Sequence, residues 1–218
     1  MSNLTFTVTG ARGEPYAAVP TLTLRLKIDD TSGEQIQLIA LRCQIQIEVK
    51  RRRYSPDEET GLLGLFGEPH RWGDTLHPIL WTHVPIMVGG FEGSIEVDIP
   101  IVCTYDLEPA STQYFRSLKD GEIPLLVQFS GTVFTKGGAG FQVEQVSWAK
   151  EARYLLPVSI WREVLDQHFP GTGWLRLRQD SIDTLVEFKG RRALLTWDDV
   201  VATLLADAER AAEPAVRV

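Results

Sequence analysis

The chain has 218 residues, 44% of them hydrophobic, so it can bury one large core or one core with an appendage. Acidic residues outnumber basic ones by 29 to 22, and the formal charge of -7 lacks the broad positive field that nucleic-acid binding uses. No window approaches the roughly 20 apolar residues of a membrane span, and the start MSNLTFTVTG has no signal-peptide pattern. These features disfavour DNA binding and membrane insertion, and they predict a cytoplasmic protein.

Alternating apolar and polar residues predict strands in the first part of the chain. The longest such run spans residues 37–49, where Ile39 to Val49 alternate with Ala40 to Glu48. Because strand side chains point to opposite faces in turn, this run has one dry face and one wet face. Shorter runs of the same kind occupy residues 4–8 and 22–28. The pattern is typical of a half-buried antiparallel sheet.

Cys43 and Cys103 are the two cysteines of the chain, and each lies at an apolar position of a strand-like run. We expect both to be small buried hydrophobic residues, although a structural disulfide remains an alternative. A CxxC or Cys/His ligand set, which would indicate a structural zinc site, is absent from the sequence.

A run of four cations, KRRR from Lys50, follows the long strand. It could bind an anion, or it could keep the end of a sheet soluble. After it, Ser55 as N-cap, Pro56 at N1 and Glu58 at N3 predict a short helix near residues 55–65.

The segment 68–83, EPHRWGDTLHPILWTH, is the best candidate for a special surface, because it holds three of the four histidines and two of the six tryptophans. Aromatic residues near an arginine suit a protein interface, although tryptophans are also common core anchors. The predicted binding surface contains Arg71, Trp72, His77, Trp81 and His83, joined by Arg51, Arg52 and Arg53. An alternative is a metal site formed by His70, His77 and His83, although their spacings of seven and six differ from those of helical or strand ligand pairs.

A second block of strands is predicted at 82–88, 95–103, 125–134 and 141–148, with a short helix near 111–118. The loop KGGAG lacks the Lys-Ser/Thr of a phosphate-binding loop and is predicted to close a hairpin. Asp106 and Glu108 are the nearest approach to paired carboxylates. A turn or cap role is expected for them, and a hydrolase that also uses His83 is the alternative.

Helical spacing of apolar residues begins after Pro157, and the stretch TGWLRLRQ could form one edge strand among the helices. Thr196 and Asp199 form a start like a capping box for the last helix. The predicted fold is therefore a β-rich α+β protein. Residues 1–156 are expected to form an antiparallel β-sandwich, with immunoglobulin-like layering as an option and helical insertions near 55–65 and 111–118. Residues 157–218 are expected to form a helical section packed on the sandwich.

The whole chain resembles an uncharacterised actinobacterial protein family whose genes often lie near those of uptake nickel-iron hydrogenases. The resemblance rests on the motifs RRRYSPDEETGLLGLFGEPHRWG, LWTH, CTYD, DGEIPLLVQFSGTVF, WREVLDQHFPGTGWLRLR and TWDDVV. The family has no assigned activity, so the resemblance implies no catalytic residues. Its gene neighbourhood suggests a hydrogenase-related partner.

The first functional hypothesis is a non-enzymatic protein-binding or assembly module, because the sheets are one-sided and no catalytic motif is present. It would need a protein partner or a second copy of the chain, and no cofactor. The second hypothesis is a metal- or small-molecule-binding accessory protein that uses His70, His77 and His83.

Overall fold

The computed structural model describes residues 3–103, 109–137, 140–172 and 177–212. The chain divides into two compact units, residues 1–172 and 173–218. Unit 1 contains all the described strands together with helices α1 to α4, and unit 2 contains α5 (Gln179–Arg191) and α6 (Trp197–Ala212).

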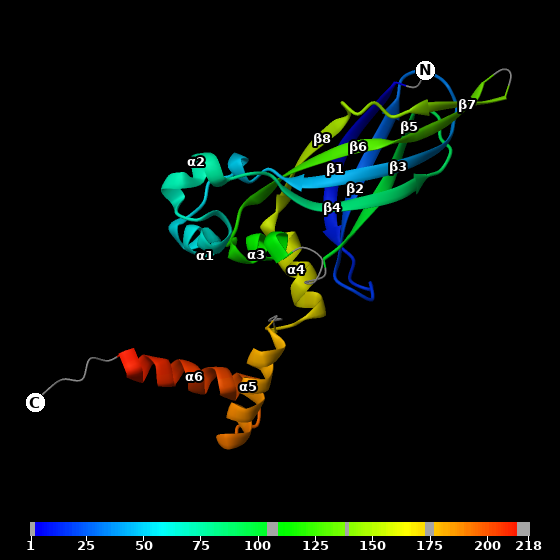
Figure 1. Cartoon of the computed structure of the whole chain (residues 1–218). Coiled ribbons are helices and arrows are strands. Elements are labelled where there is room, and N and C mark those ends of the chain that lie inside the picture. The colour runs from blue at the N-terminus through cyan, green and yellow to red at the C-terminus, as the bar shows by residue number, and fades with distance from the viewer. Residues whose placement is uncertain (1–2, 104–108, 138–139, 173–176, 213–218) are drawn as a thin grey trace, which may run out of the picture. The chain divides into compact units, whose positions relative to one another are not determined.

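Two antiparallel sheets form the body of unit 1 (Figure 1). The described strands are β1 (Leu4–Gly13), β2 (Thr21–Asp30), β3 (Ile36–Ile47), β4 (Ile79–Val88), β5 (Ser94–Val102), β6 (Glu122–Gly137), β7 (Gly140–Gln145) and β8 (Glu151–Pro157). The smaller sheet has the order β1-β2-β5, and the larger has the order β4-β3-β6-β7, with β8 also paired to β6. The predicted fold class, a β-rich protein with antiparallel sheets and helices that extend to the C-terminal part, is confirmed.

The core of unit 1 lies between the two sheets. Phe6 of β1 stacks on Phe129 of β6, with 4.3 Å between the ring centroids, so the sheets meet face to face. The apolar side chains of β3 are buried in turn, including Ile39, Cys43 and Ile47, as the alternation in the sequence predicts. The strand ends two residues earlier than expected, because Val49 begins the single-turn 3-10 helix η1 (Val49–Arg51).

Helices inserted between the strands cover one end of the sandwich (Figure 1). They are α1 (Pro56–Phe66), the 3-10 turn η2 (Pro69–Arg71), α2 (Trp72–Thr75) and α3 (Pro109–Ser117). The predicted capping box of α1 is present: the Ser55 hydroxyl accepts from the Glu58 N–H, and the Glu58 carboxylate accepts from the Ser55 N–H at 3.0 Å. Local sequence therefore determines where this helix begins.

A buried ion pair fixes α1 to the segment that leads into β6. Arg52 Nη2 donates to Glu58 Oε1 at 2.9 Å, and the two side chains are only 8% and 3% exposed. Arg52 also donates to the carbonyl oxygens of Asp120 and Glu122, while the Lys119 N–H donates to Glu58 at 2.8 Å. Burial alone would raise the pKa of Glu58, but these hydrogen bonds hold that pKa below its ordinary value.

Helix α4 (Val158–His168) belongs to unit 1, whereas the sequence placed it in the C-terminal helical section. Trp161 and Val164 are buried, and Trp161 stacks on Phe115 of α3 with 5.2 Å between the ring centroids. Strand β8 just before it was not separately predicted. Most of the expected edge strand at 172–179 lies outside the described residues, and Gln179 instead begins α5.

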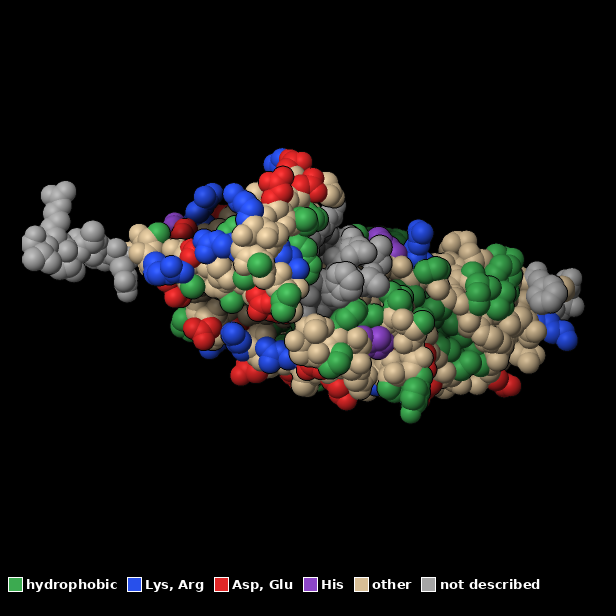
Figure 2. All heavy atoms as spheres, turned by 90° about the horizontal axis from the view of Figure 1, so that it is seen from below, with side chains coloured by type: hydrophobic (Ala, Val, Ile, Leu, Met, Phe, Trp, Pro, Cys, Tyr) green, Lys and Arg blue, Asp and Glu red, His purple; other side chains and the backbone are tan. Residues whose placement is uncertain are grey.

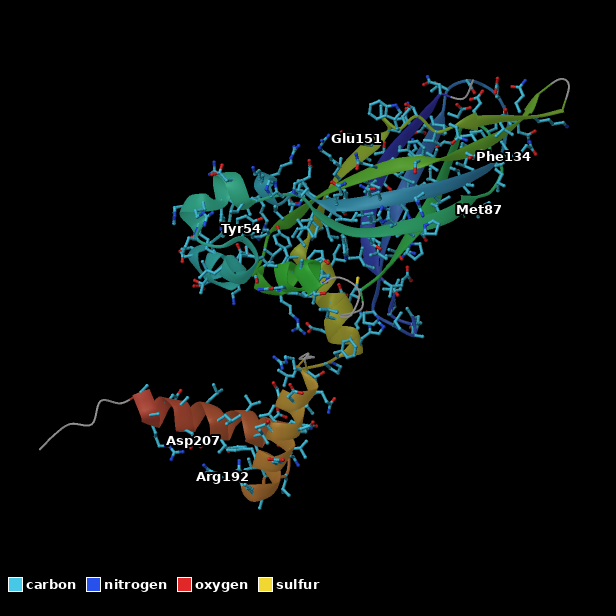
Figure 3. All side chains as sticks on the ribbon, in the orientation of Figure 1. Tyr54, Met87, Phe134, Glu151, Arg192 and Asp207 are labelled. Atoms are coloured by element: carbon cyan, nitrogen blue, oxygen red, sulfur yellow. The ribbon has the colours of Figure 1, made fainter. Side chains whose placement is uncertain are left out.

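Unit 2 contains the predicted capping box of the last helix. The Thr196 N–H donates to Asp199 at 2.9 Å, and the Asp199 N–H donates to the Thr196 hydroxyl at 3.0 Å. Arg192, which follows α5, pairs with Asp207 of α6 at 3.0 Å and so ties the two helices together (Figure 3).

Glu58→Gln should destabilise unit 1 at neutral pH by about 3 kcal/mol, because it leaves the buried Arg52 guanidinium without its counter-charge. Since the pKa of Glu58 is lowered in the folded state, its contribution is present above the ordinary pKa of about 4.3 and is lost as the pH falls through the folded value. The difference in the free energy of unfolding between wild type and Glu58→Gln should therefore become smaller in acid. Denaturant unfolding followed by tryptophan fluorescence at several pH values measures it.

Glu59→Gln is the matched control, because Glu59 lies next in the same helix and is partly exposed. It should change the free energy of unfolding by no more than about 0.5 kcal/mol. Equal stabilities of the two variants at neutral pH would contradict the structural role of the Arg52–Glu58 pair.

Candidate functional site

Trp72 and Trp81, which the sequence placed on a binding surface, are buried at 8% and 7% exposure. Trp72 lies edge-on to Tyr54 with 5.3 Å between the ring centroids, and Trp81 lies edge-on to Phe115 with 4.8 Å. Both belong to a chain of aromatic contacts that gives the helical insertion its own apolar centre. The prediction that they form part of an exposed surface was wrong, because these short helices need large side chains to bury enough area.

The three histidines of the predicted metal site do not converge. His70 lies in η2 and His77 lies between α2 and β4, both exposed, while His83 lies on β4. Among the residues that the structure describes, no group of three or more His, Cys, Asp or Glu side chains could hold a metal ion. Arg71, at the end of η2, is exposed as predicted.

The arginine run does not form a single cationic surface. Arg52 is buried in its ion pair with Glu58, so its assignment to the binding surface was wrong. Arg51 is exposed and lies 3.6 Å from Glu48, and Arg53 is exposed. A hollow of about 520 Å³ lies beside the run, but Glu58, Asp120 and Glu122 line it along with the three arginines. Charges of both signs therefore balance there, which disfavours an anion site.

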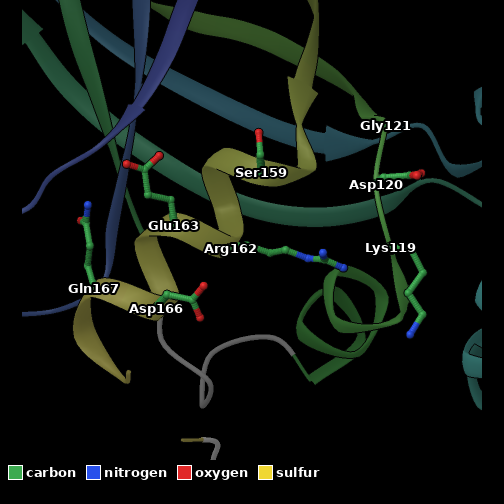
Figure 4. Close-up of a pocket in the computed structure, with 8 residues that line it drawn as sticks. All are labelled: Lys119, Asp120, Gly121, Ser159, Arg162, Glu163, Asp166 and Gln167. Atoms are coloured by element: carbon green, nitrogen blue, oxygen red, sulfur yellow. The ribbon is translucent and has the colours of Figure 1, made fainter. Parts of the chain in front are cut away.

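A larger hollow of about 760 Å³ lies between α4 and the segment before β6 (Figure 4). Arg162 crosses toward that segment and donates to the Leu118 carbonyl oxygen at 2.6 Å. The lining residues are all polar or glycine: Lys119, Asp120, Gly121, Ser159, Arg162, Glu163, Asp166 and Gln167. Ligand pockets are usually lined mainly by apolar side chains with a few convergent polar groups, and this hollow lacks such a lining.

The remaining chemically reactive candidates give no site. Cys43 and Cys103 are both free, and burial raises the pKa of each thiol to about 12, so neither is a thiolate at neutral pH. Asp106 and Glu108 lie outside the described residues.

A row of amide side chains crosses the open face of the larger sheet. Gln44 on β3 and Gln128 on β6 face each other in register, and the Gln44 amide donates to the Gln128 oxygen at 3.1 Å. Gln46 donates to the same oxygen at 3.1 Å, and His83 on β4 lies 3.1 Å from the Gln44 oxygen. Of the predicted surface residues, His83 is the one that lies on this face.

Apolar side chains occupy one end of the same face. Leu38, Phe134 and Val143 stand side by side across β3, β6 and β7, and Met87 on β4 stands opposite Ala40. Met87 is 65% exposed and Val143 is 59% exposed. Figure 3 shows Met87 and Phe134 toward the same end of the sheet, and Figure 2 shows apolar side chains gathered on the sandwich with few charged ones among them. This open sheet face, formed by the outward residues of β3, β4, β6 and β7, is the candidate functional site.

The outer face of the smaller sheet is different in kind. Arg12 pairs with Asp98 at 2.8 Å, Arg25 lies 3.6 Å from the same carboxylate, and Lys27 pairs with Asp29 at 2.8 Å. By contrast, the only charged side chain on β3 and β4, which are described throughout, is Arg42. The outer face of the smaller sheet therefore carries ion pairs suited to water. On the larger sheet the pair of Glu151 and Arg153 lies on β8, while β3 and β4 carry a single charge.

The wet face of β3 was predicted, but its composition was not used to place a binding surface there. Its outward residues include Ala40, Gln44 and Gln46, whereas the outward residues of β2 include Arg25 and Lys27. That difference in composition was visible in the sequence. Met87 and Val143 could not have been added to the surface from sequence alone, because their place on the same sheet face as β3 depends on strand order.

Comparison with known proteins gives distant structural likenesses. A β-glucosidase from Kluyveromyces marxianus is 9% identical with a TM-score of 0.27, and the match covers 72% of this chain and 15% of that one. ApaA from Bordetella pertussis is 14% identical with a TM-score of 0.24, and the match covers 71% of this chain and 93% of that one. β-Glucosidase 3B from Thermotoga neapolitana is 13% identical with a TM-score of 0.23, and the match covers 71% of this chain and 17% of that one. With such TM-scores these likenesses carry no argument about fold or activity.

No curated protein matches the sequence. Within the described residues, none of the helices combines the length and apolar character needed to cross a membrane. The model of a family of unknown function, DUF6084, matches residues 1–213, and the chain therefore belongs to that family.

Proposed function

We propose that this protein is a non-enzymatic protein-binding or assembly module and that the open sheet face is its contact surface. The observation that carries the proposal is the near absence of charge on β3 and β4, together with the exposed Met87 and Val143 at one end. The resemblance noted above suggests a nickel-iron hydrogenase system in the cytoplasm of actinobacteria as the setting. The two free cysteines fit such a reducing compartment.

Depletion of charged residues distinguishes the centre of a protein interface from the rest of a protein surface. Charged side chains keep a surface soluble, and an exposed sheet face without them is prone to association. The outer face of the smaller sheet shows how this chain treats a solvated surface, with Arg12, Arg25 and Asp98 in ion pairs. The contrast supports contact with another protein at the larger sheet.

The amide row also suits a covered surface. Gln44, Gln46 and Gln128 already satisfy part of one another's hydrogen-bonding capacity, so a partner that covers them leaves fewer polar groups unpaired. Met87 has a flexible side chain that adapts to the shape of a partner, and Phe134, on β6 at the other side of β3, gives a rigid aromatic surface at the same end of the sheet. The face therefore combines an apolar anchor region with a polar region, as standard interfaces do.

Met87→Glu and Val143→Glu should each reduce capture of the partner about tenfold or more, because they place a charge in the apolar region. The measurement is quantitative co-purification with tagged full-length protein from an actinobacterial host that encodes an uptake hydrogenase. Components of the hydrogenase system should be enriched with wild-type protein and lost with both variants.

Thr7→Glu is the matched control, because Thr7 is exposed on the smaller sheet, opposite Lys27 of β2. It introduces the same charge on the solvated face and should leave capture unchanged. If both sheet-face variants recover the same proteins in the same amounts as wild type, the open sheet face is not the contact surface. If the proteins captured have no link to hydrogenase, the proposed setting fails while the binding function stands.

A further inference from the structure

Arg42 stands as a lone cation in the middle of the open sheet face. In the register of the larger sheet it lies between Pro85 of β4 and Ser130 of β6, both of them neutral. The rows of outward residues on either side of it, which contain Ala40 and Gln44 with their partners on β4 and β6, hold no acidic side chain. The strands around Arg42 therefore provide no counter-charge for its guanidinium.

The amide row next to Arg42 is already occupied with its own hydrogen bonds. The Gln128 oxygen accepts from the amides of Gln44 and Gln46, at 3.1 Å each. His83 lies 3.1 Å from the Gln44 oxygen. A guanidinium has several N–H donors and no acceptor, so Arg42, which is exposed, depends on water for its hydrogen bonds. A partner that covers the face takes that water away.

We propose, on the basis of the binding function proposed above, that the partner of the open sheet face presents an aspartate or glutamate carboxylate to Arg42. Covering a guanidinium without a counter-charge weakens binding, whereas a carboxylate matches its planar fork with a pair of parallel hydrogen bonds. Arginines enclosed by neutral contacts that exclude water are also frequent hot spots of interfaces. The partner surface is therefore largely neutral, with an acidic residue within it.

A second copy of this chain does not supply that carboxylate from the same face. Strands β3 and β4 contain no acidic residue, and neither do residues 125–134 of β6, which pair with β3. Glu151 lies on β8, beyond β6 from Arg42, and its carboxylate pairs with Arg153 at 2.7 Å. Two copies that met about an axis near Arg42 would oppose like charges. The carboxylate is therefore assigned to a different protein.

Arg42→Gln should weaken capture of the partner about thirtyfold or more, because it leaves the partner's carboxylate covered and without a counter-charge. The measurement is the same quantitative co-purification with tagged full-length protein. Arg25→Gln is the matched control, since Arg25 lies mid-strand on the outer face of the smaller sheet, 3.6 Å from Asp98. Exposed pairs of this kind contribute little, so its capture should stay within about twofold of wild type. Thermal unfolding checks that both variants remain folded.

A coupling reagent of zero length identifies the group that Arg42 meets. Arg42→Lys keeps the charge and places an amine at this position. A water-soluble carbodiimide joins an amine to a carboxyl group in contact with it as an amide, and the reagent takes up the released water as a urea. In the captured complex, mass spectrometry should find position 42 joined to an aspartate or glutamate of the partner. Arg25→Lys is the reference, and it should be joined to Glu96 or Asp98 of its own chain.

Capture that Arg42→Gln leaves unchanged would overturn the inference and would leave Arg42 the simpler role of keeping an exposed sheet soluble. Coupling of position 42 to a carboxylate of this chain would also overturn it, as would no coupling there while Arg25→Lys reacts. If Met87→Glu abolishes capture and Arg42→Gln does not, the binding function stands and the carboxylate contact fails. If neither variant changes capture, both proposals fail.

Discussion

The alternation of side chains along β3 is the constraint on which unit 1 depends. Twelve residues in extended conformation reach about 40 Å, and every second side chain from Ile39 to Ile47 enters the core. A slip of one residue against β4 or β6 would turn this whole apolar set to the outside. Gly131 of β6 fixes the register further, because a Cβ there would lie 2.1 Å from the Ala40 carbonyl oxygen. The same pairing that buries one face of β3 determines what the other face presents.

Helices follow the end of β3, and the buried ion pair between Arg52 and Glu58 holds the first long one, α1, in position. The helical insertion packs aromatic side chains such as Trp72 edge to face, but the contacts of Trp72 with Tyr54 and Phe66 stay within the insertion. The Arg52–Glu58 pair adds direction, because its hydrogen bonds join the beginning of α1 to the backbone before β6. Buried ion pairs often contribute more to a unique arrangement than to net stability, and this pair has the contacts for such a role.

Features set by local sequence were predictable. The strand alternation of β3 and the capping boxes at Ser55 and Thr196 depend on residues within a few positions of one another. Features set by tertiary contact were not. Trp81 and Arg52 have the chemistry of a binding surface, and only the packing of α3 against β4, or of α1 against the segment before β6, reveals that they are buried. The composition of β3, the central strand of the candidate face, was visible in the sequence. The strands that lie beside β3 could not be predicted, so the rest of the face could not be either.

The proposed contact surface follows from where this acidic chain leaves charge out. With 29 acidic and 22 basic residues, it has enough charged side chains to cover its solvated faces, and the smaller sheet shows some of them in ion pairs. The open sheet face interrupts that pattern with a row of amides on β3 and β6. These amides have no use in burying the core, since their side chains point away from it. Selection for folding alone gives no reason to keep such surfaces free of charge, whereas selection for contact with other chains does.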